Sequence, residues 1–408
     1  MVNDWQVMNF DDAIAVNPAR VLAKGEEAPF IAMGDLMPFQ RRIEAMQSKE
    51  YKGSGSRFTQ GDTLLARITP CLENGKTAFI SNMPEGIVGH GSTEFIVLSR
   101  KEGLTDSLFV YYVARDPNFR SFAIQKMEGT SGRQRVPSIA LSKLSVNLPP
   151  LTEQRAIAHI LGTLDDKIEL NHQMNQTLEA IAQAIFKSWF VDFEPFRDKG
   201  MQDSPLGEIP RGWLTKPLDK VADFVNGLAL QRYPPEGDEY LPVIKIAELR
   251  RGVTESSGKA SPNIDKMYIV EDGDILFSWS GSLEVCIWCG GRGALNQHLF
   301  KVTSQNYPKW FYYQWIKHHL PEFQAIAAGK ATTMGHIQRY HLSAASVVIP
   351  PGDKLERMDM EMTPILKRII HNNLESRTLT ATRDSLLPKL LSGEIWVKDA
   401  EKFVENAV

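Results

Sequence analysis

The sequence predicts an α+β fold, in which two mixed α/β domains related by an internal repeat are separated by two long helices. We expect these helices to form an antiparallel coiled coil. Two observations support this prediction: four segments of the first half recur in the same order in the second, and each half continues into a heptad pattern. The expected parts are residues 1–150, a helical region over 151–200, residues 205–351 and a second helical region over 352–395.

The repeat is strongest where each domain ends. The segment LSKLSVNLPP from Leu141 and the segment LSAASVVIPP from Leu342 share six of ten residues at an offset of 201 positions. Three further pairs precede them in matching order. These are FVYY from Phe109 with WFYY from Trp310, GDTLLARI from Gly61 with GDILFSWS from Gly273, and the glycine-led GTSGRQRV from Gly129 with GKATTMGHI from Gly329.

The two domains are expected to be rich in β-structure. Short runs of β-branched and aromatic residues, such as Thr93 to Leu98 and Asp274 to Trp279, alternate with Gly and Pro. Runs of this kind between turn residues are typical of a mostly β or α+β domain.

The first helical region follows Pro149 and Pro150, which end the preceding strand. Thr152 is the expected N-cap, with Glu153 in the first turn facing the helix dipole. Residues spaced by seven and offset by four then predict a coiled-coil seam that includes asparagines. The seam comprises Ile157, Leu161, Leu164, Ile168, Asn171, Asn175, Leu178, Ala182, Ile185 and Trp189.

The second helical region has a similar seam, interrupted by Asn372, and Pro364 predicts a kink unless it lies near the start of the helix. Because each stripe needs a partner, we expect the helices to pack on each other. About 38 residues at 1.5 Å each would form a spacer of roughly 57 Å. The seam comprises Leu355, Met358, Met362, Ile365, Ile369, Asn372, Leu379, Leu386 and Leu390.

Composition excludes several classes of protein. No run of 18 apolar residues occurs, and the start MVNDWQVMNFDDA lacks the basic and apolar regions of a signal peptide. We therefore expect no membrane association. Three cysteines are too few for a disulfide framework, so a reducing cytoplasm is expected. The formal charge of −3 excludes a uniformly basic surface but allows local basic patches.

Catalytic and cofactor motifs are incomplete. Gly75-Lys76-Thr77 lacks the first glycine of a phosphate-binding loop, because Pro70 stands at that position. The stretch from Gly53 to Ser56 lacks the third glycine of a dinucleotide site. Cys286 and Cys289 have no second pair at zinc spacing, and half-buried strand cysteines are the better interpretation.

Two further motifs lead to the same conclusion. Asp165-Asp166-Lys167 superficially resembles part of a nuclease site, but it lies on the heptad helix, where a solvated charged face is expected. After Asn17-Pro18 comes Ala19, so no aromatic ring is available to stack on a flipped base. We expect no catalytic site, no metal site and no cofactor bound by this chain.

Basic residues are segregated along the chain. Residues 41–76 hold seven Lys or Arg against four acids, and residues 120–143 hold five against Glu128 alone. Such segregation suits a nucleic-acid binder, although a solvated loop face would look the same. The candidate DNA-binding residues are Arg41, Arg42, Lys52, Arg57, Arg67, Lys76, Arg133, Gln134, Arg135, Lys245, Arg250, Arg251, Lys330, Thr332, Thr333, His336 and Gln338.

Among the candidates, the glycine-led segments are the sharper ones. Arg133, Gln134 and Arg135 offer forked guanidiniums and an amide that suit readout of guanine and adenine edges. We expect Lys52, Arg57 and Lys76 to lie nearer to phosphates. The equivalent segment from Thr332 to His336 has different side chains, so the two loops would read different half-sites.

These features resemble the specificity subunit of a Type I restriction–modification system. The segment PPLTEQRAIAHILGTLDDKIELNHQMNQTLEAIAQAIFKSWFVDFEPF, from Pro149 to Phe196, is similar to that family's central helical region. The stretch from Pro350 to Ile395, ending SLLPKLLSGEI, is similar to the distal one, although it opens PPGDKLERM without the Glu-Gln pair of the first. The recognition domains match only in layout.

The resemblance implies a non-catalytic subunit that recognises a split, asymmetric target in double-stranded DNA. It further implies two methyltransferase partners, which bind S-adenosylmethionine and methylate adenine at N6, and restriction–translocase partners that use ATP and Mg²⁺. Two alternatives stay open at this point. One is an enzyme in its own right, which the incomplete motifs disfavour; the other is a stand-alone DNA-binding or scaffold protein without enzyme partners.

Overall fold

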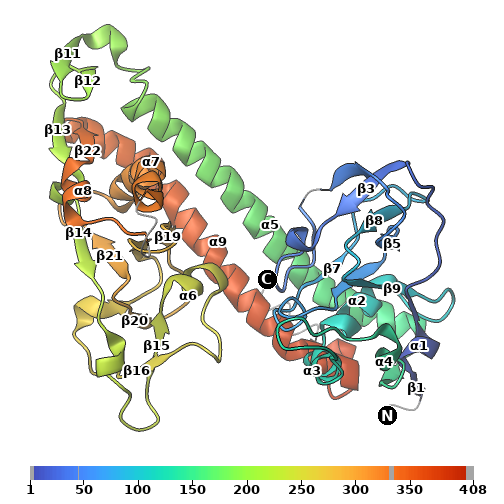
Figure 1. Ribbon diagram of the computed structural model, residues 1–408. Helices are drawn as coiled ribbons and strands as arrows, with labels where there is room; N and C mark the ends of the chain where they lie inside the picture. Colours follow the sequence, from blue (N-terminus) through green and yellow to red (C-terminus); the bar gives the residue numbers. More distant parts are fainter. Residues whose placement is uncertain (1–3, 45, 330–334, 401–408) are drawn as a thin grey trace. The chain divides into compact units, whose positions relative to one another are not determined.

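The computed structural model describes residues 4–44, 46–329 and 335–400. The chain divides into two compact units, each considered by itself: unit 1 is Met1–Leu170 with Thr378–Val408, and unit 2 is Asn171–Arg377 (Figure 1). Within the described ranges, no helix combines the length and the apolar character that crossing a membrane requires.

Unit 1 contains two four-stranded sheets and one short strand pair. The first sheet has the order β2-β9-β6-β7, the second the order β4-β3-β8-β5, and β1 pairs with β10. The strands are β1 (Gln6–Asn9), β2 (Ile14–Val16), β3 (Glu27–Ile31), β4 (Gln47–Glu50), β5 (Ser56–Phe58), β6 (Thr63–Ala66), β7 (Thr77–Phe79), β8 (Gly89–Gly91), β9 (Phe95–Arg100) and β10 (Ser145–Leu148). The short helices are α1 (Phe10–Ala13), α2 (Ser107–Arg115), α3 (Pro117–Gln125) and α4 (Ser138–Leu141).

Unit 2 repeats this topology and adds a hairpin, β11 with β12. Its sheets have the orders β14-β21-β18-β19 and β16-β15-β20-β17, and β13 pairs with β22. The strands are β11 (Met201–Ser204), β12 (Gly207–Pro210), β13 (Leu214–Pro217), β14 (Asp223–Asn226), β15 (Leu241–Ile244), β16 (Lys259–Ala260), β17 (Ile269–Val270), β18 (Ile275–Ser278), β19 (Val285–Ile287), β20 (Gly293–Leu295), β21 (Leu299–Thr303) and β22 (Ser346–Ile349). The helices are α6 (Ile246–Arg251), α7 (Lys309–Ala328) and α8 (Arg339–Ala344).

The predicted repeat is confirmed element by element. The GDTLLARI and GDILFSWS segments supply β6 and β18, which are fully buried strands next to β9 and β21. FVYY and WFYY lie in α2 and α7. Each unit also has one parallel strand pair, β3 with β8 and β15 with β20, inside otherwise antiparallel sheets. Equivalent residues can therefore be compared position by position.

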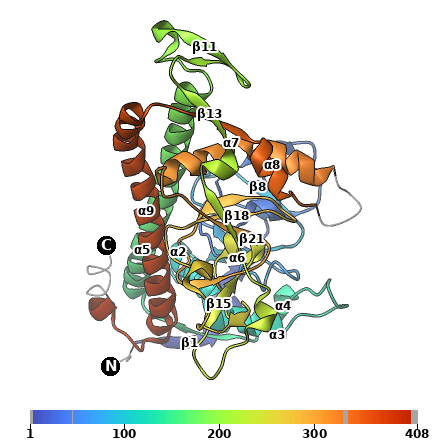
Figure 2. The ribbon, with the colours of Figure 1, turned by 90° about the vertical axis from the view of Figure 1, so that its left-hand side faces the viewer.

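Two long helices complete the fold, α5 (Leu151–Phe190) and α9 (Gly352–Ser392), and they are seen again in Figure 2. In unit 1, Ile157, Leu161, Leu164 and Ile168 of α5 are buried in one core with Leu379, Leu386 and Leu390 of α9. In unit 2, Asn175 hydrogen-bonds to Asn372, while Asn171 bonds to Ser376. As residue numbers rise along α5, the numbers of their partners on α9 fall, which confirms the antiparallel pairing.

The seam departs from the prediction toward the end of α5. Ala182, Phe186 and Phe190 are buried, whereas Leu178, Ile185 and Trp189 are only partly buried. An α-helix of 3.6 residues per turn drifts against a strict seven-residue spacing. Moreover, the rings of Phe186 and Phe190 contact Trp315 of α7, so this part of the helix packs on its domain. Met362 and Ile369 of α9 are buried as predicted, but Leu355 is only partly so.

Two other helix predictions need correction. Thr152 is not the N-cap: α5 begins at Leu151, and the Pro150 carbonyl accepts hydrogen bonds from the backbone N–H groups of Glu153 and Gln154, both at 2.9 Å. Asp165 does not lie on a solvated face. It is 3% exposed and forms an ion pair with the buried Arg383, at 2.5 Å. The bounds of α9 extend through Pro364 without interruption.

Candidate nucleic-acid interface

The glycine-led loop of unit 1, residues 128–136, is anchored to the end of β6. The backbone N–H of Val136 donates to the Arg67 carbonyl at 2.9 Å, and that of Thr69 donates to the Gln134 carbonyl at 3.0 Å. Arg67 in turn donates its backbone N–H to the Glu94 carbonyl at 3.0 Å, just before β9. The fold thus brings three of the predicted residues, Arg67, Gln134 and Arg135, to one edge of the sheet.

Arg135 is not the free guanidinium that the loop sequence suggested. Its Nε and Nη2 atoms donate to the Glu94 carboxylate at 2.6–2.9 Å, and its Nη1 atom donates to the Arg133 carbonyl at 3.2 Å. The hydrogen bonds to Glu94 raise the pKa of Arg135. Because its forked edge is already occupied by a carboxylate, Arg135 can contact a base only if that pair opens. Arg133 is exposed and Gln134 partly exposed in the same loop.

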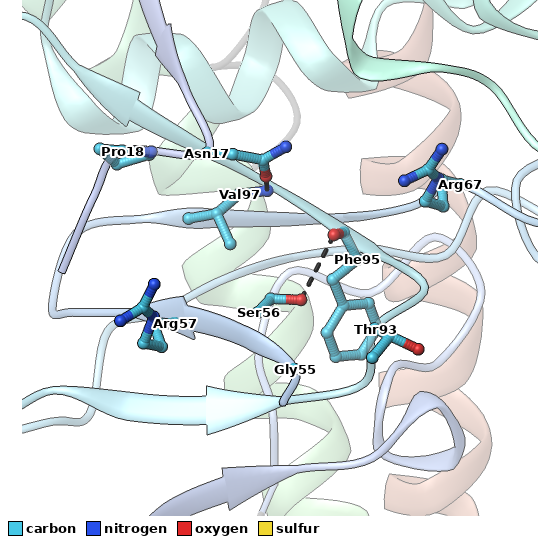
Figure 3. Close-up of a pocket in the computed structure, with 9 residues that line it drawn as sticks. All are labelled: Asn17, Pro18, Gly55, Ser56, Arg57, Arg67, Thr93, Phe95 and Val97. Atoms are coloured by element: carbon cyan, nitrogen blue, oxygen red, sulfur yellow. Dashed lines mark hydrogen bonds between the residues drawn. The ribbon is translucent and has the colours of Figure 1, made fainter. Parts of the chain in front are cut away.

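A pocket of about 270 Å³ lies beside this edge of the sheet (Figure 3). Two predicted residues line it, Arg57 of β5 and Arg67 after β6. Figure 3 shows these two arginines on opposite sides of Ser56 and Phe95. The lining as a whole comprises Asn17, Pro18, Gly55, Ser56, Arg57, Arg67, Thr93, Phe95 and Val97.

The other basic residues predicted in unit 1 do not line the pocket with Arg57 and Arg67. Arg41 needs correction, because it is bound to α5: its guanidinium forms ion pairs with Asp166 and Glu169, and its side chain is 11% exposed. Burial lowers the pKa of Arg41, but its hydrogen bonds to these acids outweigh that effect and raise it. Lys76 donates to the Met33 carbonyl at 3.0 Å. Arg42 and Lys52 are exposed.

Unit 2 places different side chains at the equivalent edge. The Trp279 carbonyl accepts from the Ile337 backbone N–H at 3.0 Å, as the Arg67 carbonyl does from Val136. Trp279 is therefore equivalent to Arg67, His298 to Glu94, and His336 to Arg135. The Trp279 ring lies 5.9 Å from the His298 ring and 6.4 Å from the His336 ring. Neither Trp279 nor His298 was predicted, although aligning the two GD segments pairs Trp279 with Arg67.

The remaining predictions for unit 2 have varied environments. Arg250, in the last turn of α6, pairs with Glu284 at 2.9 Å and lines a separate pocket of about 500 Å³ beside Gly281 and Gly335. Lys245 and Arg251 are exposed at the two ends of α6, and Gln338 is exposed before α8. Lys330, Thr332 and Thr333 lie outside the described residues.

Both cysteines of the pair, Cys286 and Cys289, are half-buried, as predicted, but Cys289 lies just after a strand and not in one. Cys286 lies in β19, and burial raises the pKa of its thiol to about 12. Burial also raises the pKa of Cys289. A thiol that stays protonated is a poor metal ligand, because the thiolate is the binding form. In the part of the chain that the structure describes, no three His, Cys, Asp or Glu side chains gather where a metal ion could bind.

Comparison with known proteins adds independent information. A family model for the Type I restriction modification DNA specificity domain matches residues 3–180 and, again, residues 210–381. The Type I restriction enzyme MjaIX specificity subunit of Methanocaldococcus jannaschii is 28% identical, over 97% of this chain and 94% of its own length. The HindI specificity subunit of Haemophilus influenzae is 25% identical, over 90% and 94%.

A solved structure has a similar fold. The crystal structure of the Type I restriction–modification S subunit from M. genitalium matches with a TM-score of 0.51 at 16% identity. The match covers 95% of this chain and 96% of that one. The similarity therefore extends over both units and both long helices.

Proposed function

This chain belongs to the family of Type I restriction–modification DNA specificity subunits, and from that premise we propose that it recognises a split, asymmetric DNA target, one half per domain. The observation that carries the proposal is the pair of equivalent edges with different side chains. Glu94 and Arg135 occupy one edge, and the equivalent His298 and His336 occupy the other. Two copies of one fold that present different chemistry would select different bases.

The proposal extends to the partners. A specificity subunit is the non-catalytic component of its complex, so methylation and cleavage would be carried out by other chains. Along the chain, each domain is followed by a long helix, and this repetition supports recruitment of two methyltransferase subunits to equivalent surfaces. Those subunits would supply S-adenosylmethionine and methylate adenine, and restriction–translocase subunits would supply ATP-dependent cleavage with Mg²⁺.

We further propose that α5 and α9 set the number of base pairs between the half-sites. Each is one helix by its bounds, of 40 and 41 residues. At 1.5 Å per residue such a helix is about 60 Å long, the length of roughly 18 base pairs at 3.4 Å. Buried asparagines in the middle of the pair support a defined register.

The test is purification of the chain with its neighbours, combined with methylome sequencing of its cells. The proposal predicts co-purification of a methyltransferase and a methylated motif in two parts separated by non-specific bases. Deleting the chain should abolish methylation at that motif. A chain that binds DNA but purifies without a methyltransferase, and whose deletion leaves the methylome unchanged, would instead be a stand-alone DNA-binding protein.

A further inference from the structure

We propose that the Arg57–Arg67 pocket of unit 1 holds the phosphodiester backbone of one DNA strand beside that unit's half-site, each arginine contacting a phosphate. The inference rests on the proposed function, because it assumes that the chain binds duplex DNA. It goes further in naming a backbone-binding site that has no counterpart among the described residues of the second domain.

The pocket is a built feature of the fold. Gly55 has φ +114°, and a Cβ atom there would lie 2.3 Å from the Gly91 carbonyl oxygen. A side chain at this position would therefore push β5 away from β8 and displace the neighbouring Arg57. This gives a role to the glycine-rich stretch from Gly53 to Ser56, which the sequence alone left unexplained.

The pocket carries positive charge without a compensating acid. None of its nine lining residues is Asp or Glu. Among the described residues, neither guanidinium has a hydrogen-bond or ion-pair partner, and the Nε atom of Arg67 is buried and unpaired. Asp62, which is close to Arg57 and Arg67 in the sequence, forms an ion pair with Arg20 at 2.7 Å and accepts a hydrogen bond from the Ser99 hydroxyl. A buried unpaired donor such as Arg67 Nε calls for an acceptor, and two cations call for an anionic one.

The neutral polar groups of the pocket argue against base readout. Ser56 donates its hydroxyl to the carbonyls of Ser92 and Phe95, and the Asn17 side-chain oxygen accepts from the Val97 backbone N–H at 2.9 Å (Figure 3). The Ser56 hydroxyl and the Asn17 side-chain oxygen are therefore already committed to holding the strands together. What remains available is mainly the charge of Arg57 and Arg67 and the partly exposed ring of Pro18, which suit phosphate and deoxyribose.

Among its described residues, unit 2 has no equivalent of this site. By strand register, Ile269 of β17 stands at the position of Arg57, and Trp279 stands at that of Arg67. The Trp279 indole N–H donates to the Asn226 side chain and to the Gln297 carbonyl, at 3.0 and 3.2 Å. An apolar residue and a satisfied indole cannot replace two free guanidiniums, so the backbone contact should occur at one half-site only.

The first measurement is the salt dependence of DNA binding by the full-length chain, purified in the assembly that its own cells form. Each phosphate contact contributes about −0.9 to the slope of log K against log salt, so losing one contact makes the slope less steep by that amount. We expect Arg57→Ala and Arg67→Ala each to make the slope less steep by about 0.9 with sequence preference unchanged. Arg57→Lys and Arg67→Lys, which keep the charge, should retain the slope, as should the matched control Arg155→Ala on the exposed face of α5.

The second measurement uses the wild-type assembly, so it does not depend on how the variants fold. Duplexes with single neutral methylphosphonates are scanned across both half-sites. We expect methylphosphonates at two positions on one strand beside the first half-site to weaken binding by the wild type. At the phosphate that a mutated arginine would contact, the same methylphosphonate should not weaken binding by that alanine variant further. Wild-type binding with no such positions, or an equal slope change for Arg155→Ala, would overturn the pocket assignment alone. Failure of the wild type to bind duplex DNA would overturn the proposed function as well.

Discussion

The buried ion pair between Asp165 of α5 and Arg383 of α9 gives the sharpest prediction about what holds the helices together. Both side chains are 4% exposed, and Arg383 Nη1 lies 2.5 Å from Asp165 Oδ1. The second Asp165 oxygen accepts from the Tyr112 hydroxyl at 2.7 Å. Burial, together with the charge of Asp165, raises the pKa of Tyr112, so this phenol remains a donor. Arg383 and Tyr112 therefore both depend on the Asp165 carboxylate.

Asp165→Asn should leave Arg383 charged and buried, with the half-exposed Asp384, at 2.7 Å, as its remaining acidic partner among the described residues. Removing one partner of a buried pair costs about 3–5 kcal/mol, and the remaining Asp384 contact places the expected loss near 3 kcal/mol. The assay is hydrogen–deuterium exchange along α5. A loss of that size makes exchange about two orders of magnitude faster between Ile157 and Ile168.

The internal repeat provides the control for this prediction. The positions equivalent to Asp165 and Arg383 in unit 2 are Leu366 and Ala182, both buried in one apolar core. An apolar replacement of the whole network, Tyr112→Phe with Asp165→Leu and Arg383→Met, should therefore lose much less than Asp165→Asn, since well-packed apolar residues often replace buried ion pairs at little cost. If the triple variant loses as much as the single one, or Asp165→Asn loses less than about 1 kcal/mol, the reasoning about this pair is wrong.

Three further predictions concern recognition and spacing. Arg133→Ala should relax one base position of one half-site at a cost of about 1–3 kcal/mol in discrimination, seen as a degenerate base in the methylated motif; uniform loss of affinity would make Arg133 a phosphate contact. Four residues inserted near Gln176 should lengthen the spacer by about two base pairs, with both half-sites unchanged in the methylome. Replacing Asn175 and Asn372 by Leu should raise the unfolding midpoint but loosen the register, so that motifs with more than one spacer length become methylated; a single spacer would show that these asparagines do not set it.

Much of the fold could be predicted from the sequence because the sequence contains an internal repeat and periodic apolar patterns. The GD segments became equivalent strands, and Ile157 to Ile168 formed the predicted seam. The prediction was wrong for the later seam residues because the large rings of Phe186 and Phe190 pack against Trp315 of α7. The heptad spacing carries no information about this tertiary contact.

The candidate site was less predictable, because basic residues look alike in a sequence. Arg41 and Arg57 are 16 positions apart in one basic stretch. Arg41 forms ion pairs with Asp166 and Glu169 of α5, which lie 125 and 128 residues later in the sequence. Arg57, by contrast, lines a pocket that has no Asp or Glu in its lining. Only tertiary contacts decide which charge is free. Trp279 was missed for a related reason: its equivalence to Arg67 is positional, and the two side chains share no chemistry.

The central claim, that each domain reads its own half of the target, is tested most directly by exchanging one domain. Residues 1–148 are replaced by the corresponding domain of a relative, with the junction placed before Pro149 so that the start of α5 and its seam remain intact. The chimera is expressed with its methyltransferase partner, and the methylome is sequenced. We expect a motif in which one half changes while the other half and the spacer stay the same. A motif altered in both halves would show that the domains do not read independently, and would contradict the central claim.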